Sequence, residues 1–156
     1  MKKGFTLIEL LIVIAIIAIL AAVVFVALDP LTRFRQARNS TRWSDITAVL
    51  DAVKVHQVDN SGSYLASVTA LTAGNYYTIG TCATGGDDGC TAKTTQAACV
   101  DLTGLVTAGY LGKVPMDPST GTAAETDYYL MKSSAGAITV GACDPEGSGV
   151  VIEIVR

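Results

Sequence analysis

Glu9 is the residue whose position most directly implies chemistry, because it is the one charged side chain in an apolar run from Gly4 to Leu28. A carboxylate inside a membrane helix costs roughly 2.5–3.5 kcal/mol or more, so its presence there indicates a function. The run is long enough to cross a bilayer as a helix, which takes about 20 apolar residues. Residues 5–28 are therefore predicted to form a membrane-crossing helix around one functional carboxylate.

The residues before this run form a very short basic leader, Met-Lys-Lys-Gly, and Phe5 follows Gly4 without a break. An ordinary secretory signal has an apolar core of about 7–15 residues with its cleavage site after that core. Here the apolar run is longer and the candidate cleavage point precedes it. The spacing of Gly4, Phe5 and Glu9 resembles the start of type IV prepilins, the family that includes type IV pilins and type II secretion pseudopilins.

The resemblance implies a processing route and an assembly role. A dedicated peptidase would cut between Gly4 and Phe5, the new amine of Phe5 would be N-methylated, and Glu9 would direct filament assembly. Because a buried carboxylate without a partner is strongly disfavoured, Glu9 would pair with a Phe5 amine, either its own or that of a neighbouring subunit. The resemblance implies the neighbour's amine. A protonated Glu9 that merely tolerates the membrane is the alternative.

Four cysteines lie in the distal half of the chain. An even number beyond an export segment indicates two disulfides in an oxidising compartment. The absence of a nearby histidine or a Cys-x-x-Cys pair disfavours a zinc site. Three pairings are open, and we favour Cys82–Cys90, which would close the flexible loop 83–89, together with Cys99–Cys143.

Composition and motifs argue against several functions. The formal charge is −3, and would become −5 without Lys2 and Lys3, which disfavours a broad nucleic-acid-binding surface. No serine-hydrolase, phosphate-loop or zinc-protease motif occurs, and His56, the one histidine, is predicted to be a helix surface or packing residue. We expect no catalytic residues, no cofactor and no metal. Four aspartates carry oxygen ligands that could bind calcium, although a calcium site is not expected. They are Asp87, Asp88, Asp117 and Asp127.

Four arginines follow the apolar run, whereas only two lysines precede it. Counting these charges would place the C-terminal part in the cytoplasm, but the leader and the cysteines imply the opposite side. The arginines either make contacts between subunits, for instance with Asp45, Asp51 or acidic loops, or form a solvated helix face. They are Arg33, Arg35, Arg38 and Arg42. Asn39 also begins a glycosylation sequon, which is a weak signal on a helix.

The distribution of apolar residues predicts an α+β fold of the pilin kind. Residues 1–4 are the leader, 5–28 the membrane or filament-core helix, 29–60 its amphipathic continuation, and 61–156 a globular head with an antiparallel sheet and disulfide-bounded loops. Apolar residues recur at helical spacing in the continuation, at Trp43, Ile46, Val49, Leu50 and Val53. The arginines are assigned to its polar face, with Asp45, Asp51 and Asp59.

Beyond residue 62 the predicted elements are short. A brief helix is expected over 101–109, capped by Asp101 and ended by Gly109, and strands over 127–132, 137–143 and 150–155. Residues 76–79 form either a short strand or part of an irregular loop.

These features predict a structural subunit of an extracellular type IV pilus, which would support adhesion, motility or DNA uptake. A pseudopilin of a type II secretion or competence system is the nearest alternative, since it shares the leader. The expected partners are further copies of the chain, the inner membrane, the prepilin peptidase and the pilus assembly machinery. The precursor would cross the inner membrane once, with its C-terminus outside.

Overall fold

The computed structural model describes residues 4–83 and 89–156, and the chain divides into two compact units. The N-terminal unit comprises Met1–Arg35 and the C-terminal unit Gln36–Arg156. Helix α1 (Leu7–Leu28) lies in the first unit, and helix α2 (Pro30–Asp59) begins in the first and continues in the second. The favoured disulfide loop 83–89 falls largely outside the described residues.

Helix α1 is apolar on all sides and has no buried residue. By length and composition, the helix that starts at Leu7 is apolar enough to cross a membrane. Helix α1 ends at Leu28, and its C-cap residue Asp29 has a φ of 38°, in the left-handed region that stops a helix. An apolar helix that nothing covers needs an apolar environment, and a bilayer or a bundle of identical helices would supply one.

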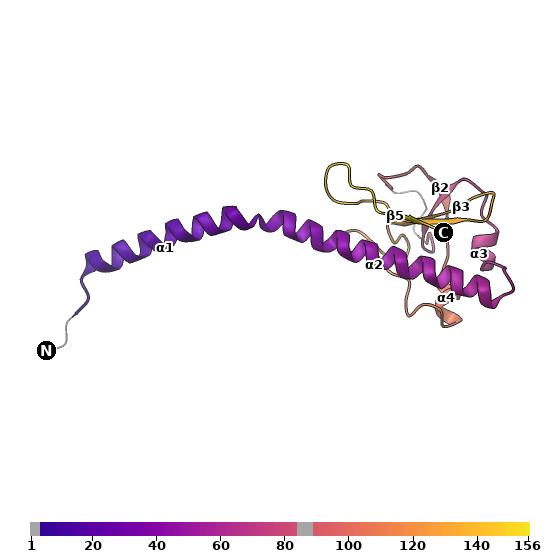
Figure 1. Ribbon diagram of the computed structural model, residues 1–156, viewed down its shortest axis with the longest axis horizontal. Coiled ribbons are helices and arrows are strands. Elements are labelled where there is room, and N and C mark those ends of the chain that lie inside the picture. Colours follow the sequence, from indigo (N-terminus) through magenta and orange to yellow (C-terminus); the bar gives the residue numbers. More distant parts are fainter. Residues whose placement is uncertain (1–3, 84–88) are drawn as a thin grey trace. The chain divides into compact units, whose positions relative to one another are not determined.

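The C-terminal unit contains the rest of α2, two short helices and one five-stranded sheet. The elements are α3 (Ala66–Thr69), β1 (Tyr76–Ile79), β2 (Thr95–Val100), α4 (Thr103–Thr107), β3 (Tyr128–Lys132), β4 (Ile138–Ala142) and β5 (Glu153–Val155). The strand order is β2-β1-β3-β4-β5. Within this unit, Figure 1 shows the strands lying alongside α2.

The α+β class is confirmed, with one difference in the sheet. It is mixed rather than antiparallel throughout, because β2 pairs parallel with β1, whereas β1–β3, β3–β4 and β4–β5 are antiparallel. Strand β2 was not predicted, nor was α3. Residues 76–79 do form a strand, and β5 begins at Glu153, later than the expected start at Val150.

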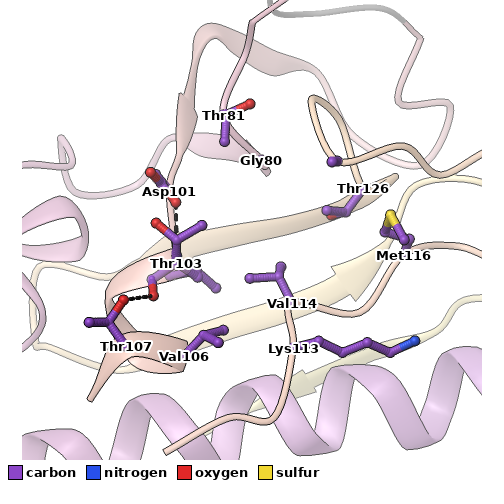
Figure 2. Close-up of a pocket in the computed structure, with 12 residues that line it drawn as sticks. Gly80, Thr81, Asp101, Thr103, Val106, Thr107, Lys113, Val114, Met116 and Thr126 are labelled. Carbon is purple, nitrogen blue, oxygen red and sulfur yellow. Dashed lines mark hydrogen bonds between the residues drawn. The ribbon is translucent and has the colours of Figure 1, made fainter. Parts of the chain in front are cut away.

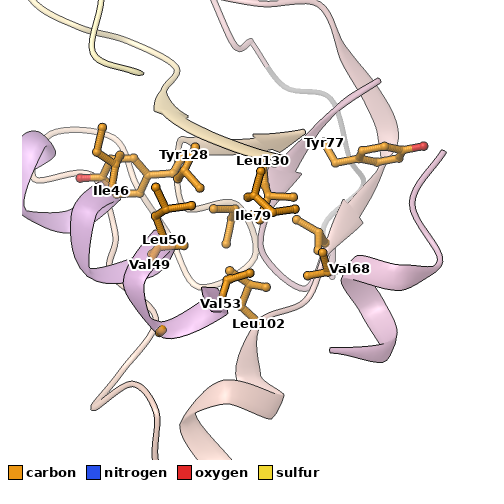
Figure 3. Packing of buried hydrophobic residues seen from close by; sticks show 14 of the residues in the cluster. Ile46, Val49, Leu50, Val53, Val68, Tyr77, Ile79, Leu102, Tyr128 and Leu130 are labelled. Carbon is orange, nitrogen blue, oxygen red and sulfur yellow. The ribbon is translucent and has the colours of Figure 1, made fainter. Parts of the chain in front are cut away.

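The core lies between α2 and one face of the sheet. Ile46, Val49 and Leu50 of α2 are 0% exposed and share a cluster with Leu130 and Val140 of the central strands (Figure 3). Their spacing on α2 matches the predicted apolar stripe. Trp43 belongs to the same predicted stripe but is 44% exposed, so the stripe enters the core only from Ile46 onward.

Tyr128 and Tyr129 are adjacent on β3, and their hydroxyls bind carboxylates on two different elements. The Tyr128 hydroxyl donates to Asp45 of α2 at 2.7 Å, and the Tyr129 hydroxyl donates to Glu153 of β5 at 2.7 Å. Burial, reinforced by these hydrogen bonds to carboxylates, raises the pKa of both tyrosines. Strand β3 is thus tied to the helix through one residue and to the far strand through the next.

Gly141 makes room for Tyr129. A Cβ atom at position 141 would lie 2.3 Å from the Tyr129 hydroxyl oxygen and 2.8 Å from the carbonyl oxygen of Ile152. We expect Gly141→Ala to lower the free energy of unfolding by about 1–3 kcal/mol, since the buried ring and the backbone must both shift. Chemical denaturation of the full chain in detergent measures this. Gly112→Ala is the control, because nothing lies within 4 Å of a Cβ there; equal stability of the two variants would contradict the steric account.

Candidate functional site

The start of α1 is organised around Thr6 and Glu9. Thr6 is the N-cap of the helix, and its hydroxyl accepts a hydrogen bond from the Glu9 backbone N–H at 3.3 Å. The Glu9 carboxylate in turn accepts from the Thr6 backbone N–H at 2.8 Å and from its hydroxyl at 2.7 Å. This reciprocal arrangement is a capping box, so Glu9 has two donors within its own chain.

Phe5 lies just outside the helix and is 84% exposed, and nothing lies within 4 Å of a Cβ built at Gly4. The Gly4–Phe5 peptide bond therefore lies in an exposed segment outside any helix or strand, before the first helical turn. Sequence reasoning paired Glu9 with a Phe5 amine and missed Thr6 as the partner in the uncut chain. The signal was present, because Thr-x-x-Glu before an apolar run is the capping-box pattern.

The arginines after the apolar run form two groups: Arg33 and Arg35 are exposed at the start of α2, whereas the next two form ion pairs with the C-terminal unit. Arg38 forms an ion pair with Glu146 at 2.9 Å, and Arg42 forms a bidentate pair with Asp117 at 2.5 and 3.0 Å. Arg42 is 1% exposed, so its assignment to the polar face of the helix was wrong. Arg38 and Arg42 therefore bind acidic loops of their own chain. The aspartates considered as partners are engaged elsewhere, Asp45 by Tyr128 and Asp51 by Arg156.

Asn39 completes the contact between α2 and the loop at Glu146. Its amide donates to the Glu146 carbonyl at 2.7 Å, while its side-chain oxygen accepts from the Glu146 backbone N–H at 3.0 Å and from Arg42 at 2.8 Å. The sequon residue is therefore used to hold the fold together. Arg38, Asn39 and Arg42 lie on one side of α2 and fix two loops, one containing Asp117 and the other Glu146.

Burial alone would raise the pKa of Asp117, but the opposing contacts are stronger. The Arg42 guanidinium and the Ser119 backbone N–H, which donates at 2.8 Å, hold the pKa of this carboxyl below its usual range. Asp117 was considered as a calcium ligand, and its oxygens are instead occupied by these donors. Asp87 and Asp88 lie outside the described residues. Across residues 4–83 and 89–156, no group of three or more potential ligand side chains is placed to hold a metal.

The cysteines form two disulfides, but with pairings that differ from the favoured ones. Cys82 is bonded to Cys99, and Cys90 to Cys143, with Cα–Cα distances of 5.6 and 4.5 Å. The physical reason is the unexpected strand β2. Because β2 lies parallel beside β1, it brings Cys99 next to the chain that leaves β1, where Cys82 lies. Cys90 is then free to reach Cys143, whose carbonyl oxygen accepts a hydrogen bond from the Ala92 backbone N–H at 2.9 Å.

Lys93 holds the end of the β1–β2 connection against the sheet face that does not contact α2. Its ammonium group forms an ion pair with Glu153 at 2.9 Å and lies 4.9 Å from the centre of the Tyr76 ring. The hydrogen bond to Glu153 raises the pKa of Lys93. Burial would raise the pKa of Glu153, but its hydrogen bonds to Lys93 and Tyr129 lower it. With the two disulfides, Lys93 ties the described parts of this connection, residues 80–83 and 89–94, to the rest of the C-terminal unit.

A pocket of about 380 Å³ lies between α4, the end of β1 and the segment around Met116. Figure 2 shows Val106, Val114 and Met116 lining it. The Asp101 carboxylate at its edge accepts from the Thr103 backbone N–H at 2.8 Å. Asp101 was predicted to cap this helix, but the N-cap of α4 is Leu102, one residue later. His56, for its part, packs edge-on against Tyr110 with ring centres 5.2 Å apart. Neither arrangement brings together a nucleophile, a base and an orienting residue.

Two similarities to known proteins agree with the arrangement of Gly4, Phe5 and Glu9 at the start of an apolar helix. Residues 1–25 match the family model of the prokaryotic N-terminal methylation motif. The chain carries this methylation motif. A stretch of 73 residues is 53% identical to the type IV wide pilus major component PilA4 of Thermus thermophilus, and it covers 44% of this chain and 50% of that protein. The matched region thus spans about half of that relative's length. No solved structure matches the chain significantly.

Peptide mapping without reduction should recover the observed disulfides. Trypsin cuts after Lys54, Lys93, Lys113 and Lys132 among other sites. The observed pairing predicts one complex of peptides 55–93, 94–113 and 133–156. Cys82–Cys90 pairing would instead leave peptide 55–93 with an internal bridge. A second cut at Asp87 or Asp88 separates Cys82 from Cys90, and recovery of Cys82 with Cys143 would contradict the structure.

Proposed function

We propose that this chain is a structural subunit of a type IV pilus, polymerised through α1. The observation that carries the proposal is the apolar helix α1, which has 22 residues and no buried residue. It contains Glu9, and most of it lies within the methylation motif matched over residues 1–25. A surface helix of a soluble protein would cover one apolar face against its own domain. This helix has no such cover, so bilayer lipid before assembly and neighbouring copies afterwards are the environments that suit it.

Processing would begin with hydrolysis of the Gly4–Phe5 peptide bond. Water adds across this bond, residues 1–4 leave with a new carboxylate, and Phe5 acquires a free α-amine. An electrophilic methyl donor then transfers its methyl group to this amine, which loses a proton. Methylation leaves the amine basic, so it stays cationic. The exposed position of Phe5 and the empty space around Gly4 support access by the prepilin peptidase.

Assembly would exchange the partners of Glu9. In the unassembled subunit, Thr6 supplies two hydrogen bonds but no positive charge. A Phe5 ammonium from a neighbouring subunit would supply both a donor and an opposite charge, which a carboxylate in a low-dielectric environment requires. The Glu9 carboxylate therefore lacks a neighbour's positive charge in the bilayer and gains one in the filament, and this difference in free energy favours assembly.

The disulfides support export of the C-terminal unit to an oxidising compartment. The precursor would then cross the inner membrane once with its C-terminus outside, and the assembled filament would be extracellular. A pseudopilin shares the methylation motif, but the similarity to a pilus major component favours the pilus. Adhesion, motility and DNA uptake are roles that such a filament would support.

The proposal predicts the identity of the mature subunit. Surface filaments sheared from the native cell, viewed by electron microscopy and dissociated, should give an intact mass for residues 5–156 with one added methyl group and two disulfides. A chain that retains residues 1–4 in filaments, or one cut after the apolar run, would contradict the processing route. Cells that lack the prepilin peptidase are the control and should accumulate the full chain in the membrane fraction.

A further inference from the structure

The segment immediately after α1 combines large apolar side chains with basic ones. Leu31 is 67% exposed and Phe34 is 61% exposed, and Arg33 and Arg35 are exposed as well. The segment begins three residues after Leu28, the last residue of α1. Its surface is therefore continuous with the surface that would contact lipid.

Dimensions place this segment at the level of lipid headgroups. Helix α1 has 22 residues, which at about 1.5 Å per residue span roughly 33 Å, close to the hydrocarbon thickness of about 30 Å. Residues 31–35 would then lie roughly 4–11 Å beyond the end of α1, where the polar layer of each leaflet is roughly 5–7 Å deep. Long arginine side chains can reach back into that layer while Leu31 and Phe34 contact the acyl boundary.

The charges near this layer favour an anionic partner. Arg38 and Arg42 are bound by Glu146 and Asp117 within the C-terminal unit, so they are not the arginines that face this layer. The nearest acidic residue, Asp29, accepts hydrogen bonds from Thr32 and also attracts Arg35 and Arg33 electrostatically. One carboxylate against two guanidinium groups leaves the segment with a net positive charge. The planar guanidinium group of arginine matches the oxygens of a phosphate diester, which is the charged group of anionic phospholipids.

We propose that Arg33 and Arg35, with Leu31 and Phe34 as apolar anchors, bind the headgroups of anionic phospholipids and set the depth of the unassembled subunit in the bilayer. The inference rests on the proposed function only in requiring α1 to span the membrane. It also accounts for the position of these arginines on the exported side of the span, because lipid phosphates compensate the net positive charge that Asp29 leaves there. Leaving the bilayer for the filament breaks these contacts, so they oppose premature release.

The selectivity of the full-length chain for spin-labelled lipids tests this proposal. The protein is reconstituted into phosphatidylcholine vesicles with a trace of spin-labelled phosphatidylglycerol or phosphatidylcholine, and electron paramagnetic resonance measures the lipid fraction immobilised on the protein. We expect a preference for phosphatidylglycerol that falls by up to about fivefold in Arg33→Gln or Arg35→Gln and further in the double variant. Raised salt should weaken the preference of the native chain, because exposed charges are screened.

Two controls assign the effect to this segment. Lys113→Gln removes an exposed cation from the C-terminal unit and should leave the preference unchanged. Lys2→Gln/Lys3→Gln removes the charges at the other end of the span and should leave the effect of the arginine substitutions intact. A double arginine variant with native selectivity, or an equal loss in Lys113→Gln, overturns the proposal. A chain that fails to float with the vesicles would refute the membrane span as well, so the two failures are distinguishable.

Discussion

Glu9→Val is expected to insert into the membrane as well as the native chain does and to yield few or no surface filaments. Replacing the carboxylate with an apolar side chain removes an insertion cost of roughly 2.5–3.5 kcal/mol, so insertion cannot suffer. Assembly suffers because the substitution removes the group that would pair with a neighbouring Phe5 amine. The measurement compares the amount of subunit in sheared filaments with the amount in the membrane fraction.

Two further variants separate the capping role of Glu9 from its charge. Glu9→Gln keeps an oxygen that can accept from the Thr6 backbone N–H but cannot carry a charge. If ion pairing drives assembly, Glu9→Gln fails as Glu9→Val does, whereas if capping alone matters, Glu9→Gln assembles. Ile16→Val, a small apolar change elsewhere on α1, is the matched control and should form filaments. Native filament yield from Glu9→Val would refute an assembly role for this residue.

The parts of the fold that could be predicted from the sequence are those with a strong local period. The apolar positions of α2 from Ile46 to Val53 show such a period, and β3 and β4 are short apolar runs next to turn residues; the structure places residues of all three elements in the core. Strand β2 has no such pattern, because the residues between Thr95 and Val100 are mostly small, polar or exposed. A parallel pair also depends on contacts distant in sequence, which a local pattern cannot reveal.

One missed strand accounts for the incorrect disulfide pairing. Short separation along the chain favoured Cys82–Cys90, but the pairing of β1 with β2 decides which sulfurs meet. The observed bridges close segments of 17 and 53 residues, worth about 3 and about 4 kcal/mol on the loop-entropy account. A local closure would have stabilised the fold less. The pairing is therefore a consequence of topology, and topology was the part that the sequence left open.

The role of Arg42 was also beyond local reasoning. Its position next to the apolar stripe suggested an exposed charge, since arginine is rarely fully buried without a partner. That partner, Asp117, lies 75 residues away in an irregular segment. Asp117 also closes its own turn by accepting from the Ser119 backbone N–H. Only the folded chain shows that one carboxylate serves both contacts.

Arg42→Met is expected to lower the free energy of unfolding of the C-terminal unit more than Gly141→Ala does. The side chains of Arg42 and Asp117 are 1% and 0% exposed, so removing the guanidinium leaves a buried carboxylate without its charge partner. Breaking a buried pair in this way costs about 3–5 kcal/mol of the free energy of unfolding. Denaturant unfolding of the full chain in detergent, followed by near-ultraviolet circular dichroism, measures the loss.

The double variant Arg42→Met/Asp117→Asn distinguishes an unpaired charge from lost packing. Asparagine can still accept from the Ser119 backbone N–H but carries no charge, so the double variant should be more stable than Arg42→Met alone. Arg38→Met is the control, since the Arg38–Glu146 pair is partly exposed and should contribute about 0–1 kcal/mol. If the double variant were no more stable than Arg42→Met, the stabilisation would reside in packing rather than in charge pairing.

The same pair predicts how stability depends on pH. Because the pKa of Asp117 is lower in the folded chain than the unfolded value of about 3.9, its contribution is fully present above that value. It is lost as the pH falls through the folded pKa, because protonation removes the charge that Arg42 binds. The native chain should therefore lose more stability between neutral and acidic pH than Asp117→Asn, which has no carboxyl to protonate at this position. Parallel pH profiles for the two chains would show that folding does not lower the pKa of Asp117.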